Sequence, residues 1–311
     1  MLFLNYVYNE LYKTLSTKIL IIFSVVLLTL ASLLTWVGDD SGTDDNEGWI
    51  ELLISENNQL EERLESDDFQ GSSRIRTHFF NRIQENNYRI ENNIPFSSGL
   101  ANMRSVSNLI ALLELMLVIV IARMIATEFE KKTIYNLIIE SRSRSLILFS
   151  KLVAGVFIIG LLIIYLIGMG VLVTTMRHGM QWLSHSDVMT LNGVVQEVTV
   201  LHSVGSHFLL SLPQVILTFS ITFFLSFFTR NSIISSAVPV FLSFFGTIIE
   251  DIVSPFSWGV IWPYLHTNMI QHVSGNPHYQ NLTIYHSIAI VLCLCISLIS
   301  ISFYQFSRLD V

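Results

Sequence analysis

The fold is decided by the stretch TEFEKKTIYNLIIESRSRSLILFSK, residues 127–151. It is a charged segment between two apolar stretches that are each long enough to cross a lipid bilayer. Apolar residues recur in it at helical spacing, on either side of a polar interruption at Ser141–Ser145. Charged, amphipathic helices held next to a membrane suit docking of a soluble protein better than binding of a solute. The sequence therefore predicts a coupling element here.

Six charged side chains of this loop are the candidate contacts to such a soluble partner. Four of them open the loop at the membrane edge, and two arginines mark the polar turn. They are Glu128, Glu130, Lys131, Lys132, Arg142 and Arg144.

A specific residue order runs through the loop and its edges: Ala122-Arg123, Glu128 to Lys131, Thr133-Ile134, Ser143-Arg144, Ile147 and Lys151. This order resembles the first cytoplasmic loop of ABC exporter permeases of the type-two family. The resemblance implies that the segment is a coupling helix seated in a groove of a separate ATPase subunit. The chain departs from the family's pattern at two positions: Lys132 stands where glycine is frequent, and Ser141 stands where proline is frequent.

Composition indicates a membrane protein independently of the loop. Hydrophobic residues make up 51% of the 311 residues and charged residues 13%, whereas soluble domains carry about 25% charged residues. The net charge of −7 is uneven, because fourteen acidic residues and six arginines lie between Val37 and Arg104. The rest of the chain sums to about +1, so nucleic acid is not an expected partner.

The apolar stretches predict six transmembrane helices, each near the roughly 20 residues that cross hydrocarbon. The predicted spans are residues 19–37, 106–126, 152–176, 207–228, 233–249 and 284–303. Residues 1–18 have the pattern of an amphipathic helix in the membrane interface. The alternative, the front of a signal peptide, has the weaker support because the segment is long and aromatic.

The polar segments between these spans predict further elements. Residues 38–105 form an acidic extracellular helical hairpin, residues 177–206 an extracellular loop, and residues 250–283 a re-entrant region at the outer surface. Two interpretations of the hairpin stay open: a solvated stalk, or a lid or receptor for a molecule that leaves the membrane. Four glycines in the third span predict close helix packing; they are Gly155, Gly160, Gly168 and Gly170.

Orientation follows from the lysines. All five lie on one side of a six-span layout, and the positive-inside rule makes that side cytoplasmic. Five or seven spans would scatter them. We therefore expect an all-α membrane protein in the bacterial cytoplasmic (plasma) membrane, multi-pass, with both termini in the cytoplasm. The resemblance implies the type V ABC exporter architecture.

Two polar side chains inside the predicted spans are candidates for a substrate path, Glu114 and Gln214. Glu114 lies about 12 Å below the outer boundary, at 1.5 Å per helical residue. An ionised carboxylate at this depth is costly, so it must be protonated, hydrogen-bonded or hydrated. A polar contact at a subunit seam is the alternative interpretation, and His207 is the nearest partner by depth.

Other chemistry is sparse in the sequence. No Gly-x-x-x-x-Gly-Lys-Ser/Thr phosphate loop occurs, so ATP and Mg²⁺ would be bound by another polypeptide. Eight histidines lie in or beside the outer segments without metal-ligand spacing, which favours packing over a metal or proton-sensing role. Cys293 and Cys295 are two residues apart in an apolar helix and point to different faces, which excludes a mutual disulfide.

With the resemblance, these features predict the permease subunit of an ABC exporter. Two six-span copies, identical or related, would pair in the lipid bilayer and bind two copies of a separate ATPase. Narrow apolar spans and a modest hairpin favour amphipathic peptides or hydrophobic drugs as cargo. The alternative is an ATP-independent membrane sensor whose outer hairpin binds a ligand. A secondary transporter is less favoured, because one intramembrane carboxylate is little machinery for ion coupling.

The six-span layout predicts opposite labelling of two single cysteines. With Cys293 and Cys295 replaced, a cysteine at Ser72 should react with an impermeant maleimide added to intact cells. A cysteine at Ser143 should react only after the membrane is opened. Labelling of both from the same side would contradict the layout.

Overall fold

Long apolar helices dominate the computed structural model, which describes residues 2–37, 48–65, 73–95, 97–140, 143–191, 193–253, 256–274 and 282–308. The chain is mostly helical, as the sequence predicts. The longer helices are α1 (Leu2–Leu15), α2 (Lys18–Val37), α3 (Trp49–Glu65), α4 (Ser73–Glu91), α5 (Ser98–Ser107), α6 (Ile110–Glu130), α7 (Thr133–Glu140), α8 (Arg144–His178), α9 (Val200–Thr229), α10 (Ser232–Val253) and α12 (Ile284–Ser307).

Short elements connect the long helices. They are the 3₁₀ helices Gln181–Ser184, Ser257–Ile261 and Pro263–His266, the four-residue helix α11 (Ile270–Val273), and the strands β1 (Ser186–Leu191) and β2 (Val194–Thr199). Of the predicted hairpin segment 38–105, residues 38–47, 66–72 and 96 lie outside the described residues.

Five helices of the described chain are long and apolar enough to cross a membrane. They are Lys18–Trp36, Ser98–Glu130, which combines α5 and α6, Arg144–His178, Val200–Thr229 and Ile284–Ser307. The stretch predicted as a further span, 233–249, lies in α10, whose apolar part Ser232–Gly246 is shorter. The chain is thus a multi-helix membrane protein.

Helix α6 is the centre of the bundle. It packs against α8, α9 and α10, and its residues Leu113, Met116, Leu117, Ile121 and Ile125 are fully buried. By contrast, α2 and α12 leave much of their apolar surface exposed. A helix that is apolar on all sides and buried suits a central position, whereas helices with exposed apolar faces suit contact with lipid.

Two of the four glycines of the third span confirm close packing. A Cβ at Gly155 would lie 2.5 Å from the ring of Phe219, and one at Gly170 would lie 2.9 Å from the sulfur of Met103. These glycines let α9 and α5 approach α8. Nothing lies within 4 Å of a Cβ built at Gly160 or Gly168, so the prediction is wrong for those two.

A two-stranded antiparallel sheet occupies the middle of the predicted outer loop. Strands β1 and β2 pair from Ser186 opposite Thr199 to Leu191 opposite Val194. The intervening sequence is Asn192-Gly193, and Gly193 has a positive φ of 76°. Asn-Gly between alternating apolar residues is a strong hairpin signal, and the expectation of a plain loop at 177–206 overlooked it.

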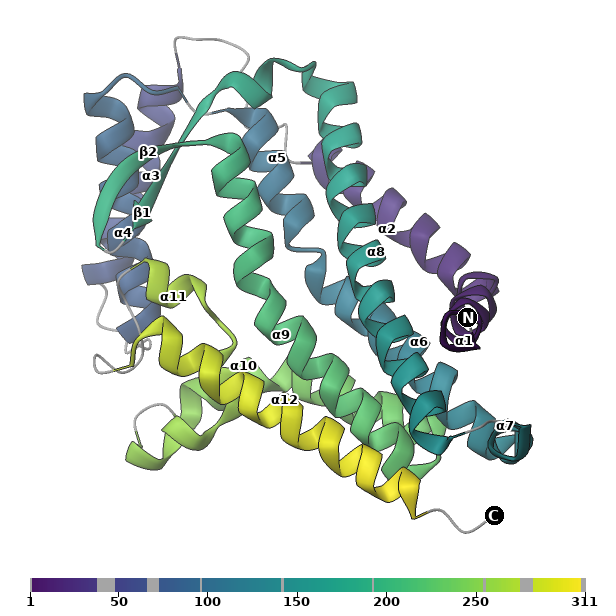
Figure 1. Cartoon of the computed structure of the whole chain (residues 1–311). Coiled ribbons are helices and arrows are strands. Elements are labelled where there is room, and N and C mark those ends of the chain that lie inside the picture. Colours follow the sequence, from purple (N-terminus) through teal and green to yellow (C-terminus); the bar gives the residue numbers. More distant parts are fainter. Residues whose placement is uncertain are drawn as a thin grey trace.

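Helices α3 and α4 pair as the predicted helical hairpin. The amide of Asn57 donates to Asn87 at 2.8 Å and accepts from Asn86 at 2.9 Å, and Arg82 pairs with Glu56 at 3.0 Å. The other side of α4 packs on β1. We call α3, α4, β1 and β2 the polar unit; it lies at one end of the long helices, far from α7 (Figure 1).

A buried ion triad joins the polar unit to the helical bundle. Asp187 of β1 bonds Arg89 of α4 at 2.6 Å and Arg104 of α5 at 2.5 Å, and it accepts from Ser203 of α9 at 2.5 Å. Burial lowers the pKa of the Arg89 guanidinium, and the Asp187 carboxylate opposes that shift. The hairpin is therefore fixed to the bundle through α4.

The triad predicts different costs for two arginines of α4. Arg89→Ala removes one partner of a buried ion pair and should lower the free energy of unfolding by about 3–5 kcal/mol. Arg82→Ala breaks a half-exposed pair and should cost at most about 1 kcal/mol. Thermal unfolding of purified protein in detergent measures both. Equal losses would contradict the assignment of the triad as the anchor.

Candidate functional site

The loop between α6 and α8 is built around a sharp turn and the short helix α7. Helix α6 ends at Glu130, and α7 begins at Thr133. Between them Lys132 has a φ of 58°, in the left-handed region that glycine adopts most readily. Lys132 keeps the turn at the cost of a less favourable backbone conformation.

Helix α7 is amphipathic and exposes one face. Ile134 and Ile138 are buried against the bundle, whereas Thr133, Asn136 and Ile139 are exposed. Ile139 is 73% exposed. An exposed isoleucine among polar side chains is the arrangement of an apolar anchor with a polar rim. Ile139 was not among the predicted contacts, all of which are charged residues.

The six charged residues predicted as contacts differ in their exposure and in their bonding partners. Lys131 and Lys132 are exposed on the turn beside α7. Glu130 is exposed too, but its carboxylate accepts bonds from the backbone N–H of Ser232 at 2.7 Å and from its hydroxyl at 2.8 Å. Glu130 therefore holds the start of α10.

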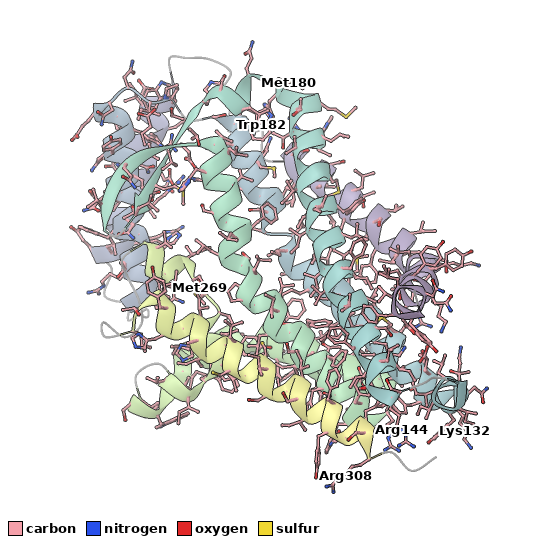
Figure 2. All side chains as sticks on the ribbon, viewed as in Figure 1. Lys132, Arg144, Met180, Trp182, Met269 and Arg308 are labelled. Atoms are coloured by element: carbon pink, nitrogen blue, oxygen red, sulfur yellow. The ribbon has the colours of Figure 1, made fainter. Side chains whose placement is uncertain are left out.

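The remaining three charged residues also differ from one another in their surroundings. Arg144 is half-buried and donates to the carbonyl of Ser307 at 3.4 Å, beside the end of α12. Arg142 lies outside the described residues. Glu128 is buried and points away from the exposed face. Figure 2 shows Lys132, Arg144 and Arg308 together at one end of the long helices, with Met180 and Trp182 at the other.

Glu128 belongs to a buried cluster of charges beneath the loop. Lys151 of α8 is fully buried, and its ammonium lies 2.9 Å from Glu10 of α1 and 2.9 Å from Glu128 of α6. Lys13 of α1 contacts the other oxygen of Glu128 at 3.2 Å. We call these four residues the inner ion cluster. It fixes α1 against the helices on both sides of the coupling loop.

Only part of the inner ion cluster could be anticipated. Glu128 and Lys151 belong to the residue order that carries the family resemblance, but no sequence pattern pairs them. Glu10 and Lys13 looked like polar-face residues of an interfacial helix. The available signal was physical: a lysine at the edge of a long apolar segment needs a carboxylate partner if it is buried.

Glu114 and Gln214, the two predicted substrate-path residues, meet in the structure. The amide of Gln214 donates to Glu114 at 3.1 Å, and the hydroxyl of Ser243 donates to the same oxygen at 2.5 Å. The bonds join α6, α9 and α10. The expected partner, His207, was the wrong choice, because Gln214 and Ser243 take that role. Glu114 is thus a hydrogen-bonded contact between helices of one chain.

A cavity of about 550 Å³ lies between the polar unit and the bundle. Helices α4, α5, α9 and α11 and strand β1 contribute to its walls, which mix amide, hydroxyl and apolar side chains. Its size falls within the range of small-molecule sites. Within the described ranges no three His, Cys, Asp or Glu side chains come together as metal ligands would.

The chain is similar to a described protein family and to a bacterial protein. Residues 73–311 match the family described as "Protein of unknown function (DUF2705)". The match begins at the first residue of α4 and includes the coupling loop. The chain is also similar to "Uncharacterized protein YhcI" of Bacillus subtilis (strain 168), with 25% identity over 99% of both chains. No solved structure matches it.

The inner ion cluster predicts a large and recoverable loss of stability. Lys151→Met leaves two buried carboxylates without their cation and should cost about 3–5 kcal/mol. Adding Glu10→Gln and Glu128→Gln removes the stranded charges and should recover much of that loss. The measurement is thermal unfolding in detergent. Lys132→Met, an exposed control, should change stability by no more than about 0.5 kcal/mol.

A triple variant no more stable than Lys151→Met alone would contradict the cluster. In that case the loss would come from packing of the lysine side chain and not from its charge.

Proposed function

We propose that this chain, which belongs to the DUF2705 family, is the membrane-spanning permease subunit of an ATP-driven ABC exporter. A dimer of two such subunits would bind two copies of a separate ATPase, which supplies ATP hydrolysis with Mg²⁺. The observation that carries the proposal is α7. It is a short, exposed, amphipathic helix held between two long apolar helices, with an apolar anchor on its free face and two lysines in the turn before it.

The connections of α7 suit transmission of force. Two residues, Lys131 and Lys132, separate it from the end of α6, and α8 begins shortly after its other end. The inner ion cluster then ties α6 and α8 to α1. Movement of an ATPase groove against α7 would therefore displace three helices together. Closure of two ATPases on ATP would open the seam between two such bundles.

The cargo proposed is an amphipathic peptide or a hydrophobic drug. Support comes from the largely apolar walls of the bundle, where the buried carboxylate of Glu114 is already bonded to Gln214 and Ser243. A site built for a strongly polar solute would present more such groups unpaired. In this arrangement α1, α7 and the last turn of α12 lie toward the cytoplasmic side; Figure 1 shows all three on the side of the molecule away from the polar unit.

A second candidate function is supported by the cavity beside the polar unit. An ATP-independent sensor would bind a ligand there, between α4 and α9, and would signal through α7. Both proposals use α7 as the contact to a soluble protein. They differ in the partner, which is an ATPase for the exporter and a kinase or another signalling protein for the sensor.

Ile139→Asp should weaken docking without unfolding the protein. The side chain is 73% exposed, so its replacement should leave expression and insertion unchanged, whereas a charge at an apolar anchor should cost about 2 kcal/mol or more of affinity. Arg144→Ala tests whether the second half of the loop also contacts the ATPase. Pull-down of the co-expressed ATPase and its activity in proteoliposomes measure both effects.

Met180→Asp is the matched control. Met180 is apolar, 75% exposed and at the opposite end of the long helices (Figure 2), so the variant should bind the ATPase like the parent. If Ile139→Asp also binds and couples like the parent, α7 is not the contact. Capture of a kinase in place of an ATPase would favour the sensor.

A further inference from the structure

A second cavity, of about 610 Å³, lies at the α7 end of the molecule. Its walls come from α1, the first turn of α2, the last turns of α6 and the turn before α7. Cations outnumber acids among its lining residues. The charged ones are Glu10, Lys13, Lys18, Arg123, Glu128 and Lys131.

The two acids of this cavity are already neutralised. Glu10 and Glu128 share the buried ammonium of Lys151, and Lys13 adds a second positive charge. The inner ion cluster thus has no net charge. The three other cations, Lys18, Arg123 and Lys131, are exposed at the cavity. The cavity therefore has an excess of three positive charges and suits an anion.

The position of α1 places this cavity at a membrane interface. Leu4, Tyr8, Tyr12 and Leu15 are exposed and, at spacings of four, four and three residues, lie along one face of α1. Such a helix lies at headgroup depth with its apolar face in the acyl boundary. The floor of the cavity continues this pattern, because Ile19, Val120 and Met124 line it where α2 and α6 enter the bundle.

We propose that this cavity binds the phosphate of an anionic phospholipid headgroup. The shared chemistry is a phosphate oxyanion held by Lys18, Arg123 and Lys131, and the interfacial position assigns it to a lipid and not to free phosphate. Basic pockets between membrane helices bind anionic headgroups in this way. The bound lipid would fill the space between α1 and α6, directly beside the inner ion cluster. It acts as a fixed ligand, separate from any cargo, and does not depend on an ATPase.

The test is lipid binding to the full chain in detergent, measured by native mass spectrometry with added phosphatidylglycerol or phosphatidylcholine. A basic residue near an anionic surface contributes about fivefold in affinity. The triple variant Lys18→Gln, Arg123→Gln and Lys131→Gln should therefore lose about a hundredfold for phosphatidylglycerol and little for phosphatidylcholine.

A matched triple variant changes the same number of charges elsewhere. Lys132→Gln, Arg230→Gln and Arg308→Gln replace three basic residues that do not line the cavity, and they should keep the parent's preference for phosphatidylglycerol. If the first triple variant does not yield folded protein, Lys18→Gln and Lys131→Gln replace it singly. Each exposed side chain should then account for about a fivefold loss.

Three results would overturn the proposal. One is equal affinity of the parent for phosphatidylglycerol and phosphatidylcholine. Another is an equal loss of phosphatidylglycerol in both triple variants, which would indicate a general charge effect. The third is thermal stabilisation of the parent by inorganic phosphate alone to the same degree as by phosphatidylglycerol, which would identify a soluble anion as the ligand.

Discussion

The buried ammonium of Lys151 constrains the structure more than any other single group. An ammonium fully buried in the protein is tolerated only with counter-charges close to it. Glu10 and Glu128 supply them from two other helices, each 2.9 Å away. Because α1 contributes one of the two carboxylates, the amphipathic N-terminal helix cannot lie anywhere along the membrane surface. It must lie across α6 and α8, next to the coupling loop.

A second buried group of ion pairs lies at the other end of the long helices. Asp187 is buried between Arg89 and Arg104, so β1 meets the consecutive helices α4 and α5 at one carboxylate. Between these two charged clusters the bundle is held by apolar packing and by the hydrogen bonds of Glu114. Ion pairs in low dielectric are sensitive to the loss of one partner but rigid when complete. The bundle thus has stiff ends and a less polar middle, which suits movement between the ends.

Much of the helical architecture follows from the sequence, because length and hydropathy are local properties. Five of the six apolar stretches predicted as spans each fall within one helix, whereas 106–126 covers the end of α5 and most of α6. Apolar residues at helical spacing located the α3–α4 hairpin. The pair Asn192-Gly193 would also have predicted the β-hairpin if turn residues had been given more weight than the expectation of helices. Pairings across long sequence separations are different. Lys151 and Glu10 are 141 residues apart, and no periodicity in one chain identifies such a pair.

The candidate sites, too, were predictable only in part: their local properties follow from the sequence, but their pairings do not. Glu114 and Gln214 were predicted separately from their depth in the membrane, and they meet, because polar side chains at one depth satisfy each other where water is absent. The depth argument chose His207 wrongly, since depth gives no rotation about the helix axis. In the loop between α6 and α8, charge alone did not reveal that the carboxylates of Glu130 and Glu128 bond within the chain. Exposure, which a sequence does not give, identified Ile139.

The inner ion cluster also links the two proposals made for the α7 end. One surface of this region is the exposed face of α7, and the other is the basic cavity beneath α1. Both rest on Glu128, the last buried acid before the turn, which contacts Lys13 on one side and Lys151 on the other. A headgroup in the cavity would hold Lys13 and α1 in place, and a partner on α7 would pull on the same turn. Because Glu128 lies directly before the turn, a ligand in the cavity and a partner on α7 would act on each other through this carboxylate. If both proposals hold, the ion pairs between α1 and α6 would let the lipid environment influence the position of α7.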